Sequence, residues 1–105
     1  MYLQDRSTSL GGPLVQAPTI ESVKLAAQKL NNVIVRTHIV DLHTYDYSDD
    51  ISLKVETLQP IGSYKVRGVY NWAASLAKEQ LALGLSTHSA GNTAQALGYI
   101  SGLLN

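Results

Sequence analysis

One lysine lies where the sequence changes from a strand pattern to a helix pattern. Alternating apolar and polar residues predict a strand over 51–56. The segment 59–63 contains a proline and a glycine, which end that strand. A helix is predicted to begin near Tyr64, with Ser63 placed to cap its first turn and Lys65 just inside it.

The position of Lys65 suggests nucleophilic chemistry. The positive end of a helix disfavours a second positive charge, and burial acts in the same direction. Both effects favour the neutral amine, which is the form that attacks carbonyl groups. The alternative is a solvated surface lysine, which is the usual state of this residue type.

A second segment could bind an anion. Ser89-Ala90-Gly91-Asn92 follows a short predicted strand over 85–88 and leads into a predicted helix that starts near Asn92 or Thr93 and continues to residue 104. Such a loop offers backbone N–H groups that suit a carboxylate or a phosphate, and a glycine permits close approach. The alternative is an ordinary strand-to-helix connection that is capped by a serine or an asparagine.

Two blocks of the sequence resemble those of a known family. Residues 62–68, Gly-Ser-Tyr-Lys-Val-Arg-Gly, resemble the Ser-Phe-Lys-x-Arg-Gly motif of threonine and serine dehydratases, which are fold-type II pyridoxal-phosphate enzymes. Residues 89–95, Ser-Ala-Gly-Asn-Thr-Ala-Gln, resemble the Ser-Ala-Gly-Asn-His-Ala-Gln loop of that family. The order and separation of the blocks also match, and a weaker likeness extends upstream to Val35-Arg36-Thr37-His38.

The resemblance implies a cofactor, a reaction and residue roles. Lys65 would bind pyridoxal 5'-phosphate as a Schiff base and then act as the general base at the substrate α-carbon. Asn92 would hydrogen-bond the ring hydroxyl, and Tyr64 would pack beside the ring. The residues implied to hold the substrate carboxylate are Ser89, Gly91, Asn92 and Thr93. The reaction would be β-elimination of threonine or serine to a 2-keto acid and ammonia, as in amino-acid metabolism and isoleucine biosynthesis.

Three positions depart from the family pattern. Tyr64 replaces phenylalanine and adds a hydroxyl group. Thr93 replaces the commoner histidine, and related β-elimination and β-replacement enzymes carry threonine here, which leaves the substrate open. Ala90 stands where serine racemases place a second serine, so its identity favours elimination over racemisation. Arg67 could hold an anion, but the resemblance suggests instead a structural role behind the lysine.

The predicted elements make an α/β fold, and the resemblance implies that it is the N-terminal part of a fold-type II enzyme, which is similar to the tryptophan synthase β chain. A helix over 20–30 with Thr19 as its cap precedes the first strand, and a long helix over 64–82 connects the strands 51–56 and 85–88. Such a crossover makes the two strands parallel. Two parallel strands do not form a stable sheet alone, so we expect part of a larger domain.

The domain plan is an irregular arm over 1–18 and a partial catalytic domain over 19–105. The resemblance puts the glycine-rich phosphate loop and the partner of the pyridine nitrogen beyond Asn105, so we expect little or no activity from this chain by itself. The alternatives are a truncated fragment or assembly module without catalysis, or a sister enzyme such as serine racemase, threonine synthase or a cysteine synthase. A full-length protein would be a homo-oligomer.

Composition excludes several classes. The 105 residues carry eight basic and eight acidic side chains, so charge gives no case for nucleic acid or an anionic membrane. There is no cysteine, and no apolar run reaches the roughly 18 residues of a membrane span. The N-terminus lacks a secretory pattern, which favours a cytoplasmic protein. His38, Asp41, His43 and Asp46 match no established ligand spacing, so no metal site is expected.

Overall fold

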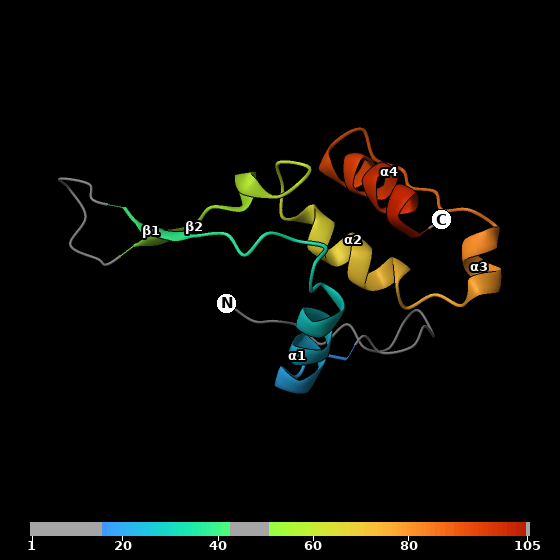
Figure 1. The fold of residues 1–105 in the computed structure, drawn as a ribbon, viewed down its shortest axis with the longest axis horizontal. Helices are drawn as coiled ribbons and strands as arrows, with labels where there is room; N and C mark the ends of the chain where they lie inside the picture. The colour runs from blue at the N-terminus through green and yellow to red at the C-terminus, as the bar shows by residue number, and fades with distance from the viewer. Residues whose placement is uncertain (1–15, 43–50, 105) are drawn as a thin grey trace, which may run out of the picture.

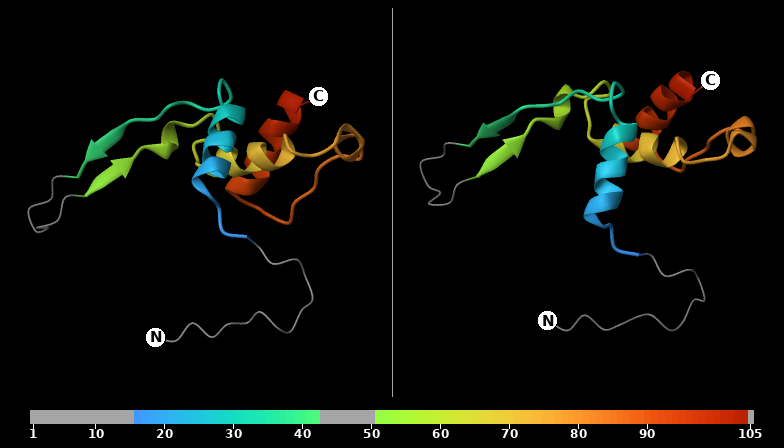
Figure 2. Two further views of the ribbon diagram at one scale, coloured as in Figure 1. Left: turned by 90° about the horizontal axis from the view of Figure 1, so that it is seen from below. Right: turned by 60° about the horizontal axis from the view of Figure 1, so that its bottom comes forward.

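The computed structural model describes residues 16–42 and 51–104, and Figure 1 shows their arrangement. The elements in chain order are α1 (Ile20–Lys29), β1 (Ile39–Asp41), β2 (Ser52–Lys54), the 3-10 helix η1 (Glu56–Leu58), α2 (Lys65–Ala73), α3 (Lys78–Ala82) and α4 (Asn92–Leu104). Both views in Figure 2 show the β1–β2 ribbon extending away from the helices. None of the helices in these two stretches is long and apolar enough to cross a membrane.

Helix α1 forms where the sequence predicts it. The Thr19 hydroxyl accepts a hydrogen bond from the Ser22 N–H at 3.2 Å, and the Ser22 hydroxyl accepts one from the Thr19 N–H at 3.0 Å. These reciprocal bonds satisfy N–H groups that a helix start leaves unpaired. After the helix, Asn32 adopts a φ of 66°, a left-handed conformation that turns the chain toward β1.

The sheet differs from the predicted one. Strands β1 and β2 pair antiparallel, with Val40 opposite Leu53. Residues 85–88 form no strand with any part of 16–42 or 51–104, so the predicted parallel pair is absent from the described structure. A strand exists only where a neighbour completes its ladder of hydrogen bonds, and here the neighbour of 51–56 is the segment just before it in sequence.

The helix predicted over 64–82 is two helices, which corrects the sequence-based boundary. Helix α2 ends at Ala73, where the N–H groups of Ser75 and Leu76 bond three residues back and tighten the last turn. The Ser75 hydroxyl bonds the Asn71 carbonyl at 2.7 Å and accepts a bond from Lys29 Nζ at 2.7 Å. The extended backbone of Ala77 then starts α3 in a new direction.

The hydrophobic core lies between α2 and α4, which pack along each other. Val66, Ala73 and Ile100 are fully buried at its centre. Helix α4 begins at Asn92, where the sequence predicts its start, and Leu97 on its predicted apolar side is also buried. The side chains packed around the centre are only partly buried: Val33, Ile34, Ile61, Val69, Tyr70, Leu85 and Leu104.

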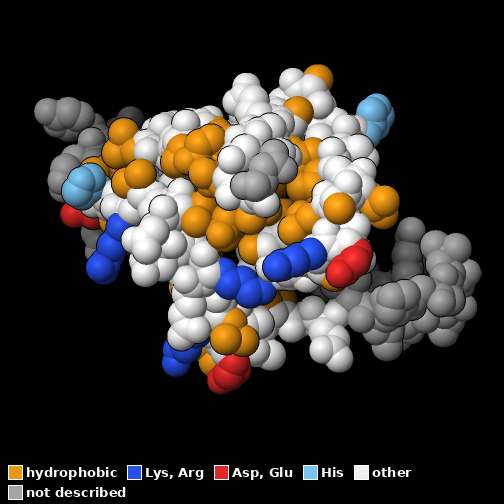
Figure 3. Space-filling view, turned by 45° about the vertical axis from the view of Figure 1, so that its right-hand side comes forward, with side chains coloured by type: hydrophobic (Ala, Val, Ile, Leu, Met, Phe, Trp, Pro, Cys, Tyr) orange, Lys and Arg blue, Asp and Glu red, His pale blue; other side chains and the backbone are white. Residues whose placement is uncertain are grey.

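Hydrophobic side chains are also exposed over α3 and α4. Figure 3 shows them gathered on the face formed by the C-terminal half of the chain. Leu81, Leu85 and Leu104 line a hollow between these helices, and Leu83 and Leu103 lie exposed nearby. The core of the described residues is therefore small relative to the apolar surface that they present.

Candidate cofactor site

A tight turn delivers the chain to the start of α2. The Gly62 N–H bonds the Gln59 carbonyl at 2.7 Å, and Gly62 has a φ of 68°, a conformation that glycine adopts without steric cost. Ser63 is buried, and its hydroxyl accepts a hydrogen bond from the Lys65 N–H at 3.2 Å. The predicted strand over 51–56 ends earlier, at Lys54, and the 3-10 helix Glu56–Leu58 precedes the turn. Ser63 bonds the first turn as predicted, but the cap position itself is occupied by Tyr64, whose side chain makes no capping hydrogen bond.

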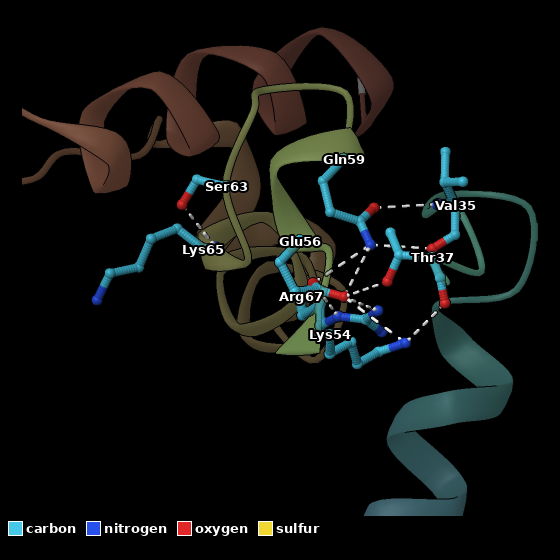
Figure 4. Close-up of polar contacts among 8 residues, drawn as sticks. All are labelled: Val35, Thr37, Lys54, Glu56, Gln59, Ser63, Lys65 and Arg67. Atoms are coloured by element: carbon cyan, nitrogen blue, oxygen red, sulfur yellow. Dashed lines mark hydrogen bonds and ion pairs between the residues drawn. The ribbon is translucent and has the colours of Figure 1, made fainter. Parts of the chain in front are cut away.

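Lys65 is the first residue of α2, and its side chain is half-buried. Its Nζ lies 5.1 Å from the centroid of the Tyr64 ring, so the aromatic residue flanks the amine. No hydrogen bond or ion pair engages this amine within 16–42 and 51–104. In Figure 4 the Lys65 side chain points away from the polar cluster behind it.

That polar cluster is centred on Glu56 (Figure 4). Arg67 donates two hydrogen bonds to its carboxylate, from Nε to Oε2 at 2.7 Å and from Nη2 to Oε1 at 2.8 Å. The Thr37 hydroxyl donates to Oε1 at 2.7 Å. Lys54 Nζ lies 3.9 Å from Oε1 and donates to the Thr37 carbonyl at 3.0 Å. Two-point contact with a guanidinium is the strongest and most directional form of carboxylate recognition.

Gln59 connects this cluster to the segment that leads into β1. Its side chain is 4% exposed and pairs with the backbone of Val35 as a strand neighbour would. Its Oε1 accepts from the Val35 N–H at 3.0 Å, and its Nε2 donates to the Val35 carbonyl at 2.9 Å. The same Nε2 lies 3.3 Å from Glu56 Oε2. A single buried amide thus satisfies polar groups of two chain segments.

The second predicted block lies at the start of α4. The Ser89 hydroxyl accepts a hydrogen bond from the Gly91 N–H at 3.2 Å, and Asn92 is the first residue of the helix. Asn92 is exposed and Thr93 is half-buried. Because the first N–H groups of a helix have no intrahelical partner, this end can receive an anion.

The fold brings the two blocks onto neighbouring helices. Lys65 begins α2 and Asn92 begins α4, and these helices share the core built on Val66 and Ile100. No hydrogen bond or ion pair joins Lys65 to the segment 89–93 in the described structure. The roles assigned to the individual residues of both blocks therefore stay predictions.

A comparison with models of protein families matches most of this chain. Residues 30–105 match the family model of pyridoxal-phosphate dependent enzymes. The chain is a member of this family. The expected cofactor is accordingly pyridoxal phosphate, and the likeness to threonine dehydratases is confirmed. No solved structure matches the chain significantly.

Several members of the pyridoxal-phosphate dependent family are similar to this chain. "L-threonine ammonia-lyase" of Thermotoga maritima is 40% identical over 75% of this chain and 20% of its own length. "Serine racemase" of Dictyostelium discoideum is 36% identical over 79% of this chain and 26% of its own length. "beta-hydroxyaspartate dehydratase" of Paracoccus denitrificans is 37% identical over 78% of this chain and 27% of its own length. The chain spans about a quarter or less of these relatives.

Some predictions fall outside the described structure. The arm predicted over 1–18 lies mostly there, as do His43 and Asp46. Within 16–42 and 51–104, no group of three or more histidine, cysteine, aspartate or glutamate residues could hold a metal ion. The arm, the division at residue 18 and the expected lack of a metal site remain predictions.

Sequence reasoning missed the contacts of Glu56, Gln59 and Thr37. It assigned Glu56 to a strand face and gave Gln59 only a place in the break. The available signal was the pair of polar residues Glu56 and Gln59 just before the motif that contains Arg67. An arginine given a structural role needs a carboxylate partner, and Glu56 supplies it.

The ion pair predicts how stability depends on pH. The hydrogen bonds from Arg67 are the largest cause that lowers the pKa of the Glu56 carboxyl from 4.5 to about 2. Burial raises this pKa, whereas the hydrogen bonds from Thr37 and Gln59 and the charge of Arg67 lower it further. Because the folded-state pKa is depressed, the stabilisation is fully present above pH 4.5 and is lost as the pH falls toward 2. We expect the free energy of unfolding at pH 7 to be about 1.5–3 kcal/mol higher for the wild-type chain than for Glu56→Gln, which is the range for hydrogen bonds to charged groups.

Urea unfolding of both chains at pH 7, 4.5, 3 and 2 would measure this difference. Other carboxylates contribute equally to the two chains, so the difference isolates Glu56. A gap between the two chains that stays constant from pH 7 to pH 2 would contradict the assignment.

Proposed function

We propose that this chain is the lysine-bearing part of a pyridoxal-phosphate dependent ammonia-lyase that acts on threonine or serine. The observation that carries the proposal is the amine of Lys65, which is held at a helix start without a polar partner among the described residues. The names of the relatives add support, since threonine ammonia-lyases and dehydratases recur among them.

The residues present fit the lysine side of a cofactor site. Lys65 offers a primary amine, a group that bonds covalently to the cofactor aldehyde. Tyr64 offers an aromatic face beside that amine. The start of α4 offers N–H donors and the amide of Asn92.

The proposed roles follow from these groups. When bound, pyridoxal phosphate supplies an electron sink for the negative charge that develops at the substrate α-carbon. Lys65 would hold the cofactor through its amine and, with that amine free, would take the α-proton of the substrate. Asn92 would donate to the ring hydroxyl, and Tyr64 would pack beside the ring. Ser89, Gly91, Asn92 and Thr93 orient the substrate carboxylate through the positive end of α4.

Elimination then needs a leaving group. The β-hydroxyl departs with a proton as water, and hydrolysis of the remaining enamine yields a 2-keto acid and ammonia. Ala90 has no side-chain group that can deliver a proton to the opposite face of the α-carbon, which favours this outcome over racemisation. We propose a cytoplasmic enzyme that is a homo-oligomer when full length.

The test is a titration of the chain with pyridoxal phosphate, followed by borohydride reduction and mass mapping of all five lysines. We expect the trapped cofactor on Lys65. Scattered labelling of several lysines would overturn the proposal for this chain and favour the alternative of a fragment or assembly module without a cofactor site.

The reaction is tested separately. We expect little or no turnover by the 105-residue chain, and robust turnover by a verified product of this length would contradict that expectation. A complete enzyme that carries these residues should convert threonine or serine to a 2-keto acid and ammonia. Formation of D-serine, threonine or cysteine as the main product would favour serine racemase, threonine synthase or a cysteine synthase instead.

A further inference from the structure

The first turn of α2 is anchored on two sides. Val66 is 0% exposed and packs into the core that contains Ile100. Arg67 is bound at two points by Glu56. Because each residue of a helix turns by about 100°, the side chains of residues 65 and 67 leave the axis about 200° apart. With Val66 and Arg67 both fixed, the helix cannot rotate about its axis, and the direction of Lys65 is set (Figure 4).

Glu56 is itself fixed from several directions. The Thr37 hydroxyl and the buried Gln59 amide both donate to its carboxylate, and its side chain is 18% exposed. Gln59 in turn holds the backbone of Val35 by two hydrogen bonds. The carboxylate therefore links the segment 35–37 directly to α2, because it binds Thr37 on one side and Arg67 on the other.

We infer that Glu56 is a positioning residue for Lys65, which acts through Arg67 to fix the rotation of α2 and hence the direction of the lysine amine. This inference rests on the proposed function insofar as the amine is the point of cofactor attachment. It assigns Glu56 no contact with cofactor or substrate. A carboxylate in this place serves orientation, because the strong two-point bond specifies geometry as well as contributing energy.

A purely stabilising role for Glu56 makes a different prediction. If Glu56 only adds stability, Lys65 should have the same reactivity in every variant that is equally stable. If Glu56 orients α2, its loss should change the behaviour of Lys65 even in molecules that remain folded. The comparison therefore needs a variant that loses stability elsewhere. Leu97→Ala serves, since Leu97 is buried in α4 and has no part in the polar cluster.

The experiment uses the full 105-residue chain in five forms: wild type, Glu56→Gln, Arg67→Lys, the double variant that combines these two changes, and Leu97→Ala. Each is studied at a urea concentration that gives the same folded fraction. The first readout needs no cofactor: competitive acylation with acetic anhydride gives the reactivity of Lys65 relative to Lys78, which is exposed at the start of α3. The second readout is the share of borohydride-trapped pyridoxal phosphate found on Lys65.

We expect Glu56→Gln to change the Lys65 to Lys78 acylation ratio and to lower the trapped share on Lys65 about tenfold, the scale of one lost charge-assisted hydrogen bond. Arg67→Lys should behave alike, because an ammonium cannot make the two-point contact. The double variant should lose no more than either single one, since both remove the same interaction. Leu97→Ala should match wild type in both readouts.

Three results would overturn the inference. Unchanged readouts in Glu56→Gln would leave it a stabilising residue only, as would equal changes in Leu97→Ala. Additive losses in the double variant would show that Glu56 does not act through Arg67. If the wild-type chain traps no cofactor on Lys65, the proposed function fails, and the acylation ratio still decides whether Glu56 orients the lysine.

Discussion

Lys65→Ala is expected to abolish site-specific attachment of pyridoxal phosphate. The variant removes the amine at the start of α2, and no other lysine of the described structure combines that position with a flanking aromatic ring. Attachment should fall to the level of unspecific labelling, measured by the visible absorbance of the titrated chain and by mass mapping after reduction. The change should leave the fold intact, because Lys65 makes no side-chain hydrogen bond among the described residues and alanine favours helices.

Two control variants sharpen this result. Lys65→Arg retains the charge beside Tyr64 but cannot bond covalently to an aldehyde, so it should lose attachment as fully as alanine does. Lys78→Ala removes an exposed lysine from the same position of another helix and should retain full attachment. Attachment that persists in Lys65→Ala, or that is lost in Lys78→Ala, would mean that Lys65 is not the cofactor lysine.

Ile100→Ala is expected to cause the largest loss of stability. Ile100 is fully buried between α4 and α2, and replacing a buried isoleucine with alanine costs about 2–5 kcal/mol. Among the residues that the structure describes, only Val66 and Ala73 share the centre of the core, so few neighbours can move in to fill the cavity. A loss of this size is a large fraction of the free energy of unfolding of a small domain. Thermal or urea unfolding followed by circular dichroism would measure it.

Leu103→Ala is the matched control for Ile100→Ala. It removes a side chain of the same size from the same helix, but Leu103 is 49% exposed. It should cost less than about 1 kcal/mol, as surface substitutions usually do. An equal loss in both variants would mean that the exposed face of α4 is also packed in solution. A wild-type chain without a cooperative transition would favour the alternative of a fragment that does not fold alone.

Local sequence determined the helix starts and the turn before Lys65. The capping box of Thr19 and Ser22 lies within one helical turn. The segment 59–63 forms a turn because of the backbone preferences of its own proline and glycine. The start of α4 followed from Gly91 and Asn92 in the same way. These features depend on neighbours a few residues apart, so a sequence pattern is enough to predict them.

The end of α2 at Ala73 could not be predicted from local sequence. Helical periodicity continues from Val66 through Leu76, and that continuity predicted one long helix. The break occurs where the Ser75 hydroxyl bonds both the Asn71 carbonyl and Lys29, a residue of α1 that is distant in sequence. Serine competes for backbone hydrogen bonds in many helices, but only a tertiary contact such as that with Lys29 fixes which serine ends one.

The sequence motifs were enough to predict the family and the turn before Lys65, because motif residues and their order need no tertiary contact to be recognised. The pairing of β2 with β1 rather than with 85–88, and of Glu56 with Arg67, became visible only in the folded chain. Strand pairing and ion pairs join residues whose side chains meet only after the chain has folded. Periodicity reports which face of an element is buried, but it does not identify the residue across from it.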